Sequence, residues 1–190
     1  MLLRMMVLAL ALLSQSVYAQ SRFGLGVVTG SYSVDDPKGS TDSANETSLF
    51  GVMTIPVNRN FPDWRYWFGL NYNAFELEPS TQDVGQEVTS VSIETILQKG
   101  FNVSSEIKPY AGLGVGVGAN DFTKRHTIDS DGYLAERYED RSETSFYLIA
   151  NLGVATRKLD SGFFIGTSLS YKTPLEDGIE ATELNLFFLY

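Results

Sequence analysis

Residues 108–119 read KPYAGLGVGVGA. Apolar residues and glycines alternate through it one by one. This period of two belongs to a β-strand, because successive side chains of a strand point to opposite faces. One face carries Ala111, Leu113, Val115 and Val117, and the other carries little besides glycine. Neither face offers charge to bulk water in the strand centre, unlike the solvated face of an ordinary antiparallel sheet.

The same period recurs along the rest of the chain and predicts eight strands in all. They span residues 21–34, 47–56, 64–77, 86–99, 108–119, 144–156, 162–172 and 182–190. Short connections at 57–63, 100–107 and 157–161 alternate with mostly longer polar ones at 35–46, 78–85, 120–143 and 173–181. With its flanks, each longer connection has a net charge of −3 or −4. Short turns at one end and long loops at the other are typical of outer-membrane barrels.

The first nineteen residues are interpreted as a signal peptide. Arg4 gives a positive start, an apolar run covers 5–13, and Val17 and Ala19 are the small residues that precede a cleavage site. The run is about half of the roughly 20 residues that a spanning helix needs. We therefore expect a signal peptide over 1–19 and one barrel domain over 20–190. Losing Arg4 takes the formal charge from −9 to −10, so nucleic acid is not expected as a partner.

Two all-β folds fit this pattern, a soluble lipocalin-like barrel and a closed barrel in lipid. A soluble barrel needs a charged face along every strand, and here one face has almost no charge within the strand centres. A closed barrel satisfies every backbone group without edges, as lipid requires. Aromatic residues gather toward the strand ends, which suits interfacial girdles. We predict an eight-stranded antiparallel up-and-down transmembrane β-barrel.

Two segments resemble a known family. The chain ends in an alternating apolar stretch on an aromatic residue, 184–190, and the segment 109–116 alternates glycine with apolar residues. Together they resemble the small eight-stranded outer-membrane barrels of the OmpA/OmpX-like and opacity type. The resemblance implies a Gram-negative outer membrane, periplasmic termini and contact with membrane lipid and lipopolysaccharide. It also implies assembly by periplasmic chaperones and the barrel-assembly machinery, which would recognise Leu184, Leu186, Phe188 and Tyr190.

The interior of such a barrel is just wide enough for side chains. Inward glycines alternate with large inward residues, so a plugged interior is expected. An interior polar network is predicted from Arg65, Asn71, Glu94, Lys172, Glu183 and Asn185. Lys172 and Glu183 flank the last loop, and we predict an ion pair between them at the outer mouth, two solvated rim residues being the alternative. Arg65 and Glu94 lie on adjacent strands about four residues out of register, so they would meet only through the network.

No catalytic residue, cofactor or metal ligand is predicted. His126 is the only histidine, and its surroundings lack the nucleophile and orienting acid that catalysis requires. They also do not reproduce the His–Ser pair of the lipid A deacylases among small barrels. The segment 129–132 resembles part of a calcium loop, but Leu134 and Asp140 stand where glycine and glutamate are needed. Lys124, Arg125 and His126 are candidates for contact with lipopolysaccharide phosphates, with a solvated loop as the alternative.

The function that fits these features best is a non-enzymatic outer-membrane barrel serving envelope structure or surface interaction through acidic external loops, where an extracellular ligand would bind. A narrow channel or a lateral path for small hydrophobic molecules, as in OmpW-like barrels, is the alternative. A lipid-modifying enzyme and a soluble lipocalin-like carrier are further alternatives.

Overall fold

The protein is described from a computed structural model that covers residues 21–36, 38, 42–58, 61–102, 107–156, 162–176 and 178–190. The expected signal peptide, 1–19, lies outside the described residues. Nine strands form the structure: β1 Arg22–Val34, β2 Asp42–Asn58, β3 Phe61–Leu77, β4 Gly85–Gly100, β5 Ile107–Ile128, β6 Leu134–Arg137, β7 Arg141–Thr156, β8 Phe164–Pro174 and β9 Ile179–Leu189. No helix in the described ranges is long and apolar enough to cross a membrane.

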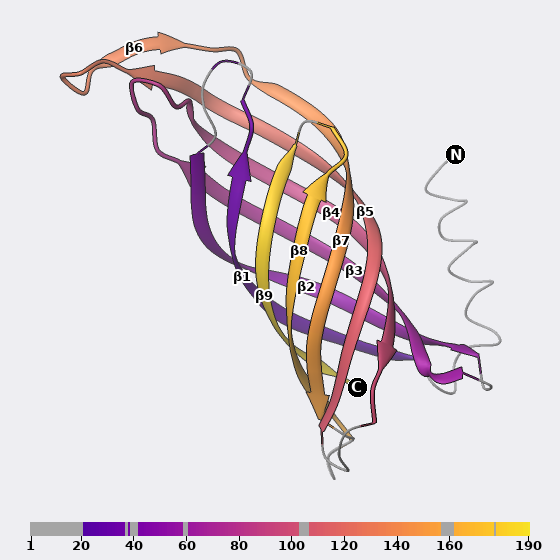
Figure 1. Ribbon diagram of the computed structural model, residues 1–190. Helices are drawn as coiled ribbons and strands as arrows, with labels where there is room; N and C mark the ends of the chain where they lie inside the picture. The colour runs from indigo at the N-terminus through magenta and orange to yellow at the C-terminus, as the bar shows by residue number, and fades with distance from the viewer. Residues whose placement is uncertain are drawn as a thin grey trace.

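Eight of these strands close into a barrel (Figure 1). The order is β4-β3-β2-β1-β9-β8-β7-β5, the β4–β5 pairing completes the ring, and every pairing is antiparallel. Apart from β6, strands that follow one another along the chain are neighbours in the barrel, and β1 pairs with β9. The predicted eight-stranded up-and-down barrel is therefore confirmed. We call the end near Arg22 and Leu189 the terminal end, and the opposite end, which carries β6, the loop end.

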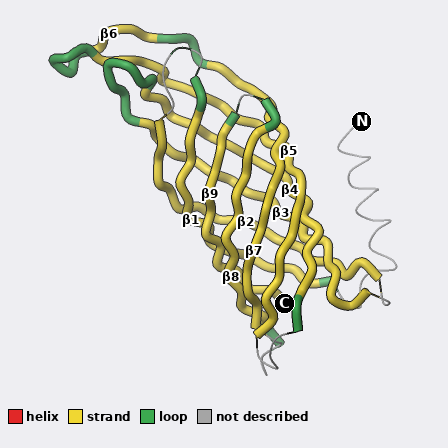
Figure 2. The backbone as a smooth tube through the Cα atoms, in the orientation of Figure 1, coloured by secondary structure: helices red, strands yellow, loops and turns green. Residues whose placement is uncertain are grey.

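The ninth strand and the lengths of several others differ from the prediction. β5 continues to Ile128, nine residues past its predicted end at 119, and pairs there with β6 to form a hairpin beyond the barrel (Figure 2). β2 starts at Asp42, whereas the predicted strand began at residue 47. Outside a membrane, both faces of a strand can be polar, so the apolar alternation disappears although the backbone ladder continues. The hydrophobic pattern therefore located the spanning part of each strand and missed the extension.

The outward face of the barrel is apolar. Leu25 and Leu113 each leave 73% of their surface exposed, and Leu152 leaves 62%. Large exposed apolar side chains occur on all eight barrel strands. A folded chain exposes this much contiguous apolar surface only where something other than water covers it. Polar residues take over toward the loop end, where Thr47 and Thr29 join their hydroxyls across β1 and β2 at 3.2 Å.

The inward faces fill the barrel in layers. A terminal-side cluster contains Val28, Phe50, Val52, Trp67, Ile96, Tyr110, Tyr147, Ile149, Phe187 and Leu189. A loop-side cluster contains Tyr32, Val34, Phe75, Leu77, Val88, Phe122, Ile179 and Ala181. Polar and charged side chains lie between them. The predicted arrangement of small against large residues is present, because a Cβ on Gly26 would overlap the ring of Phe50 and one on Gly166 the ring of Phe187.

Candidate functional site

The centre of the barrel holds an ion triad formed by Lys172, Glu94 and Glu183. Lys172 Nζ lies 2.8 Å from Glu183 Oε2 and also contacts Glu94 Oε1. At most 7% of each of the three side chains is exposed. Lys172 and Glu183 come from the neighbouring strands β8 and β9, whereas Glu94 comes from β4, which pairs with neither of them. The triad therefore connects opposite walls of the barrel across its interior.

The structure brings together the ion pair that the sequence predicts between Lys172 and Glu183. It lies buried between the two apolar clusters, deeper than the outer mouth where it was expected. Glu94 was expected to meet Arg65 through the network and instead binds Lys172. The ladder pairs Glu94 with Gly69 and Arg65 with Gln98, so the expected offset of four residues is present.

Two hydrogen-bonded chains extend through the polar layer. In the first, Asn71 Nδ2 donates to Ser92 Oγ at 3.4 Å, and Ser92 Oγ donates to Glu94 at 3.3 Å. The second chain has three hydrogen bonds of 2.8–3.1 Å, which connect side chains from four strands: Gln98, Asn151, Ser170 and Asn185. Of the six residues expected in the network, Asn71, Glu94, Lys172 and Glu183 are thus linked, and Asn185 belongs to the second chain. Arg65 lies apart at the terminal end, where Nη1 reaches Thr54 Oγ1 at 3.5 Å.

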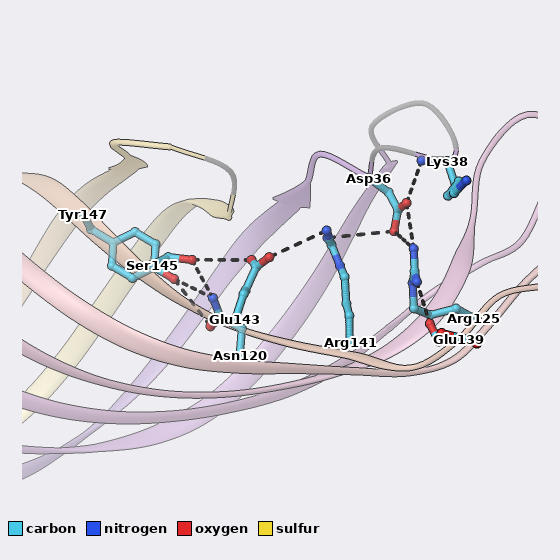
Figure 3. A network of polar contacts seen from close by, with 9 residues as sticks. All are labelled: Asp36, Lys38, Asn120, Arg125, Glu139, Arg141, Glu143, Ser145 and Tyr147. Carbon is cyan, nitrogen blue, oxygen red and sulfur yellow. Dashed lines mark hydrogen bonds and ion pairs between the residues drawn. The ribbon is translucent and has the colours of Figure 1, made fainter.

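A second charge cluster closes the loop end (Figure 3). Arg125 on β5 donates two hydrogen bonds from Nη2 to the carboxylate of Asp36, at 2.8 and 2.9 Å. Its Nη1 donates to the backbone carbonyl of Glu139 at 2.6 Å. Asp36 follows β1, and its side chain is 2% exposed. This buried pair ties the β1–β2 connection to the strand that carries the β6 hairpin.

The cluster continues down the inner wall from the loop end. Arg141 Nη2 lies 3.9 Å from Asp36, and its Nη1 lies 3.6 Å from Glu143. Ser145 Oγ donates to Glu143 at 3.4 Å and accepts from Asn120 Nδ2 at 3.0 Å. Figure 3 shows these side chains in one line, ending at Tyr147. The line links the loop end to the packed interior.

Asp36 has a pKa below its usual range as the balance of opposing causes. Burial raises the pKa of this carboxyl, while the hydrogen bonds from the Lys38 backbone N–H and from Arg125, with the charges of Arg125 and Arg141, lower it further than burial raises it. A carboxylate held by several donors stays ionised. The pair with Arg125 therefore persists over the neutral pH range.

The three candidates for contact with lipopolysaccharide do not form one surface. A β-bulge at Lys124, whose φ is 55°, interrupts the strand alternation and turns Arg125 inward to Asp36. Its guanidinium is therefore unavailable to an external phosphate. Lys124 points outward, with 72% of its side chain exposed, and pairs with Glu87 at 2.5 Å. His126 Nδ1 lies 2.7 Å from the backbone carbonyl of Lys124. Only Lys124 and His126 are thus left to meet a headgroup.

The segment that resembles part of a calcium loop forms the turn between β5 and β6. Asp129 Oδ1 accepts backbone N–H groups from Asp131 and Tyr133, both at 2.9 Å, and Gly132 has a φ of 83°. This carboxylate oxygen therefore serves the turn. Throughout the described ranges, no three acidic, histidine or cysteine side chains are grouped as metal ligands.

The fold is shared with solved outer-membrane barrels. Neisserial surface protein A (NspA) superposes with a TM-score of 0.62 at 14% identity, over 89% of this chain and 95% of that one. OprG of Pseudomonas aeruginosa superposes with a TM-score of 0.57 at 14% identity, over 89% of this chain and 94% of that one. Ail of Yersinia pestis was solved with the heparin analogue sucrose octasulfate. It superposes with a TM-score of 0.52 at 19% identity, over 90% of this chain and 96% of that one.

Sequence comparison places the chain in a family. No curated protein shows significant sequence similarity to it. The family model described as the outer membrane protein beta-barrel domain matches residues 5–190. The matched residues include all eight strands that form the closed ring in the structure. The chain is an outer-membrane protein and belongs to the outer membrane protein β-barrel domain family.

Proposed function

We propose that this protein is a closed, non-enzymatic barrel that serves envelope structure or surface interaction through its acidic external loops. The supporting observation is the triad of Lys172, Glu94 and Glu183, which crosses the interior between two apolar clusters. An ion path would have to break this triad and move both clusters. The loop end faces the outside and the terminal end faces the periplasm, in agreement with the long polar connections at the former.

The loop end suits a partner that presents basic groups. The connections there carry nearly all of the excess negative charge. The β5–β6 hairpin projects beyond the barrel, and all four residues of β6 are exposed. The buried pair of Arg125 and Asp36 holds its base in place, so binding would cost little ordering of the loop. Heparin-like polyanions, represented in the Ail complex, are disfavoured by this charge.

The narrow channel or lateral path is the less favoured function. A lateral path needs a gap in the wall, and the ladders around β5 are nearly continuous. β5 pairs with β4 from Gly100 to Gly85 with one register shift, and with β7 from Ile107 to Phe122 without interruption. A channel along the axis would meet the ion triad.

Planar-bilayer recording tests the closed barrel. We expect no stable conductance steps from the folded protein, with its heat-dependent gel shift as the control for folding. A triple variant, Glu94→Ala, Lys172→Ala and Glu183→Ala, serves as the matched control, since it removes the triad and leaves the loops unchanged. Regular conductance steps from the natural chain would reject the closed barrel in favour of the channel.

Two further measurements test the remaining parts. Mass spectra of lipid A from cells with and without the protein should be identical, and any modified species would reject the non-enzymatic role. Barrels in nanodiscs should bind polylysine-coated beads and not heparin-coated ones. Replacing the exposed Asp131 and Glu136 by their amides should weaken that retention. Stronger binding to heparin would reject an acidic interaction surface.

A further inference from the structure

The terminal end of the barrel contains a cavity that the closed interior does not explain. Its volume is about 460 Å³, within the range of roughly 300–1,000 Å³ that small-molecule sites occupy. It opens beneath the terminal-side cluster, and Trp67, Tyr110 and Phe187 form part of its wall. The triad of Lys172 lies on the other side of that cluster. That cluster therefore separates the cavity from the triad.

Two arginines line this cavity, and neither has a carboxylate partner among the described residues. Arg22 at the start of β1 and Arg65 on β3 both line it. Arg22 stacks on the ring of Phe164, with Cζ 3.5 Å from the ring centroid. Within the part of the chain that the structure describes, the hydrogen bonding of Arg65 is limited to the long contact with Thr54. Among the described side chains, neither arginine forms an ion pair with an acid.

The acid available in the cavity wall is already bound. Asp63 lines the same cavity, but Lys108 Nζ holds its carboxylate at 2.6 Å. The described wall thus contains three cations and one acid, in a chain whose net charge is −9. Partly buried like charges that share a cavity are costly unless a counter-charge joins them.

We propose that this cavity binds an amphiphilic anion, a carboxylate or phosphate joined to an apolar body. The guanidinium fork of arginine matches both anions in two-point geometry. Arg22 and Arg65 would hold the anionic head, and Trp67, Tyr110 and Phe187 would cover the apolar body. The ligand enters from the terminal end, either from solution or from the adjacent lipid leaflet.

Quenching of Trp67 fluorescence provides the test. The chain has two tryptophans, so a Trp64→Phe background leaves Trp67 as the only reporter. The folded protein is placed in nanodiscs of uncharged lipid and titrated with 6-bromohexanoate, whose bromine quenches nearby indole. We expect saturable quenching, and much weaker quenching by the matched uncharged 6-bromohexanamide. Equal quenching by acid and amide overturns the proposal without any need for a variant.

Charge variants locate the site. Arg22→Gln combined with Arg65→Gln should weaken binding about tenfold or more, since a charge-assisted hydrogen bond contributes about 1.5–3 kcal/mol. Lys99→Gln is the matched control, because Lys99 lies near the same end but on the outward face, beside Trp64 and Phe101. Unchanged affinity in the double arginine variant, or an equal loss in Lys99→Gln, overturns the proposal.

A lipid-borne quencher distinguishes the two sources of the anion. The titration is repeated in nanodiscs that contain phosphatidic acid brominated on its acyl chains, with brominated phosphatidylcholine as the uncharged control. Quenching by added bromohexanoate supports a soluble ligand. Arginine-dependent quenching only with brominated phosphatidic acid supports a membrane lipid. Absence of arginine-dependent quenching in both forms overturns the site.

Discussion

The two buried charge clusters of this barrel have similar chemistry and different surroundings. The triad of Lys172, Glu94 and Glu183 crosses the middle of the barrel, enclosed by apolar clusters above and below. The cluster of Asp36, Arg125 and Arg141 lies under loops at the loop end. The first joins walls that no backbone hydrogen bond connects, while the second joins a loop to one wall. Loss of the first should therefore affect the whole barrel, and loss of the second the loop end alone.

Lys172→Met should produce the largest effect. It leaves two glutamates facing each other without their cation, and breaking a buried pair in this way costs about 3–5 kcal/mol. We expect a lower midpoint of unfolding in denaturant, with the heat-dependent gel shift as the measure of folding. Adding Glu94→Gln and Glu183→Gln should recover much of the loss, since the uncompensated charges disappear. If the Lys172→Met variant were as stable as the natural chain, this would contradict a central role for the triad.

Asp36→Asn should produce a smaller and local effect. The amide cannot accept both charged hydrogen bonds from Arg125, and a hydrogen bond to a charged group contributes about 1.5–3 kcal/mol. Hydrogen exchange should accelerate in the 35–38 segment and in the outer part of β5. Amides at the centre of β4 and β9 should keep their protection. Faster exchange throughout the barrel would show that the two clusters are coupled, contrary to the comparison.

Acid should reproduce the Asp36→Asn effect at the loop end. The pKa of Asp36 is lower in the folded protein than in the unfolded chain, so its contribution is fully present above the unfolded value. It is lost as pH falls through the still lower folded value. Hydrogen exchange of the 35–38 segment, normalised for intrinsic rates, should rise only in strong acid, and Asp36→Asn should abolish this step. A step near neutral pH would contradict the assignment.

Lys124→Gln should have the smallest effect. The pair of Lys124 and Glu87 lies on the outer surface, with 72% of the lysine side chain exposed. Solvent and salt screen such pairs strongly. We expect no measurable change in the denaturation midpoint, which makes this variant a control for the two buried clusters. A clear loss of stability would mean that surface pairs at the loop end contribute more than their exposure suggests.

Much of this organisation was predictable because the alternation of side chains is a local property. The segment 108–119 placed its glycines inward and its aliphatic residues outward, as the structure has them. The pair of Lys172 and Glu183 was predictable because a hairpin brings strands β8 and β9 into a simple register. The same reasoning separated Arg65 from Glu94 by four positions.

Other features were not predictable from alternation. Arg125 was grouped with Lys124 and His126 because the three are consecutive, although the bulge at Lys124 turns Arg125 to the inner face. The extension of β5 beyond 119 was missed because its residues are mostly polar and do not continue the apolar alternation. The cavity of Arg22 and Arg65 was missed because its wall is assembled from several strands of the ring.

The eight barrel strands, the face of each spanning residue and the apolar surface follow from the amino-acid sequence alone, since a period of two is read along a single strand. Which inward residues meet depends on the tertiary structure. Closure of the ring puts β4 opposite β9 and its neighbour β8, and this brings Glu94 to Lys172. The shear of a closed barrel sets that meeting, and no local pattern in either strand contains it.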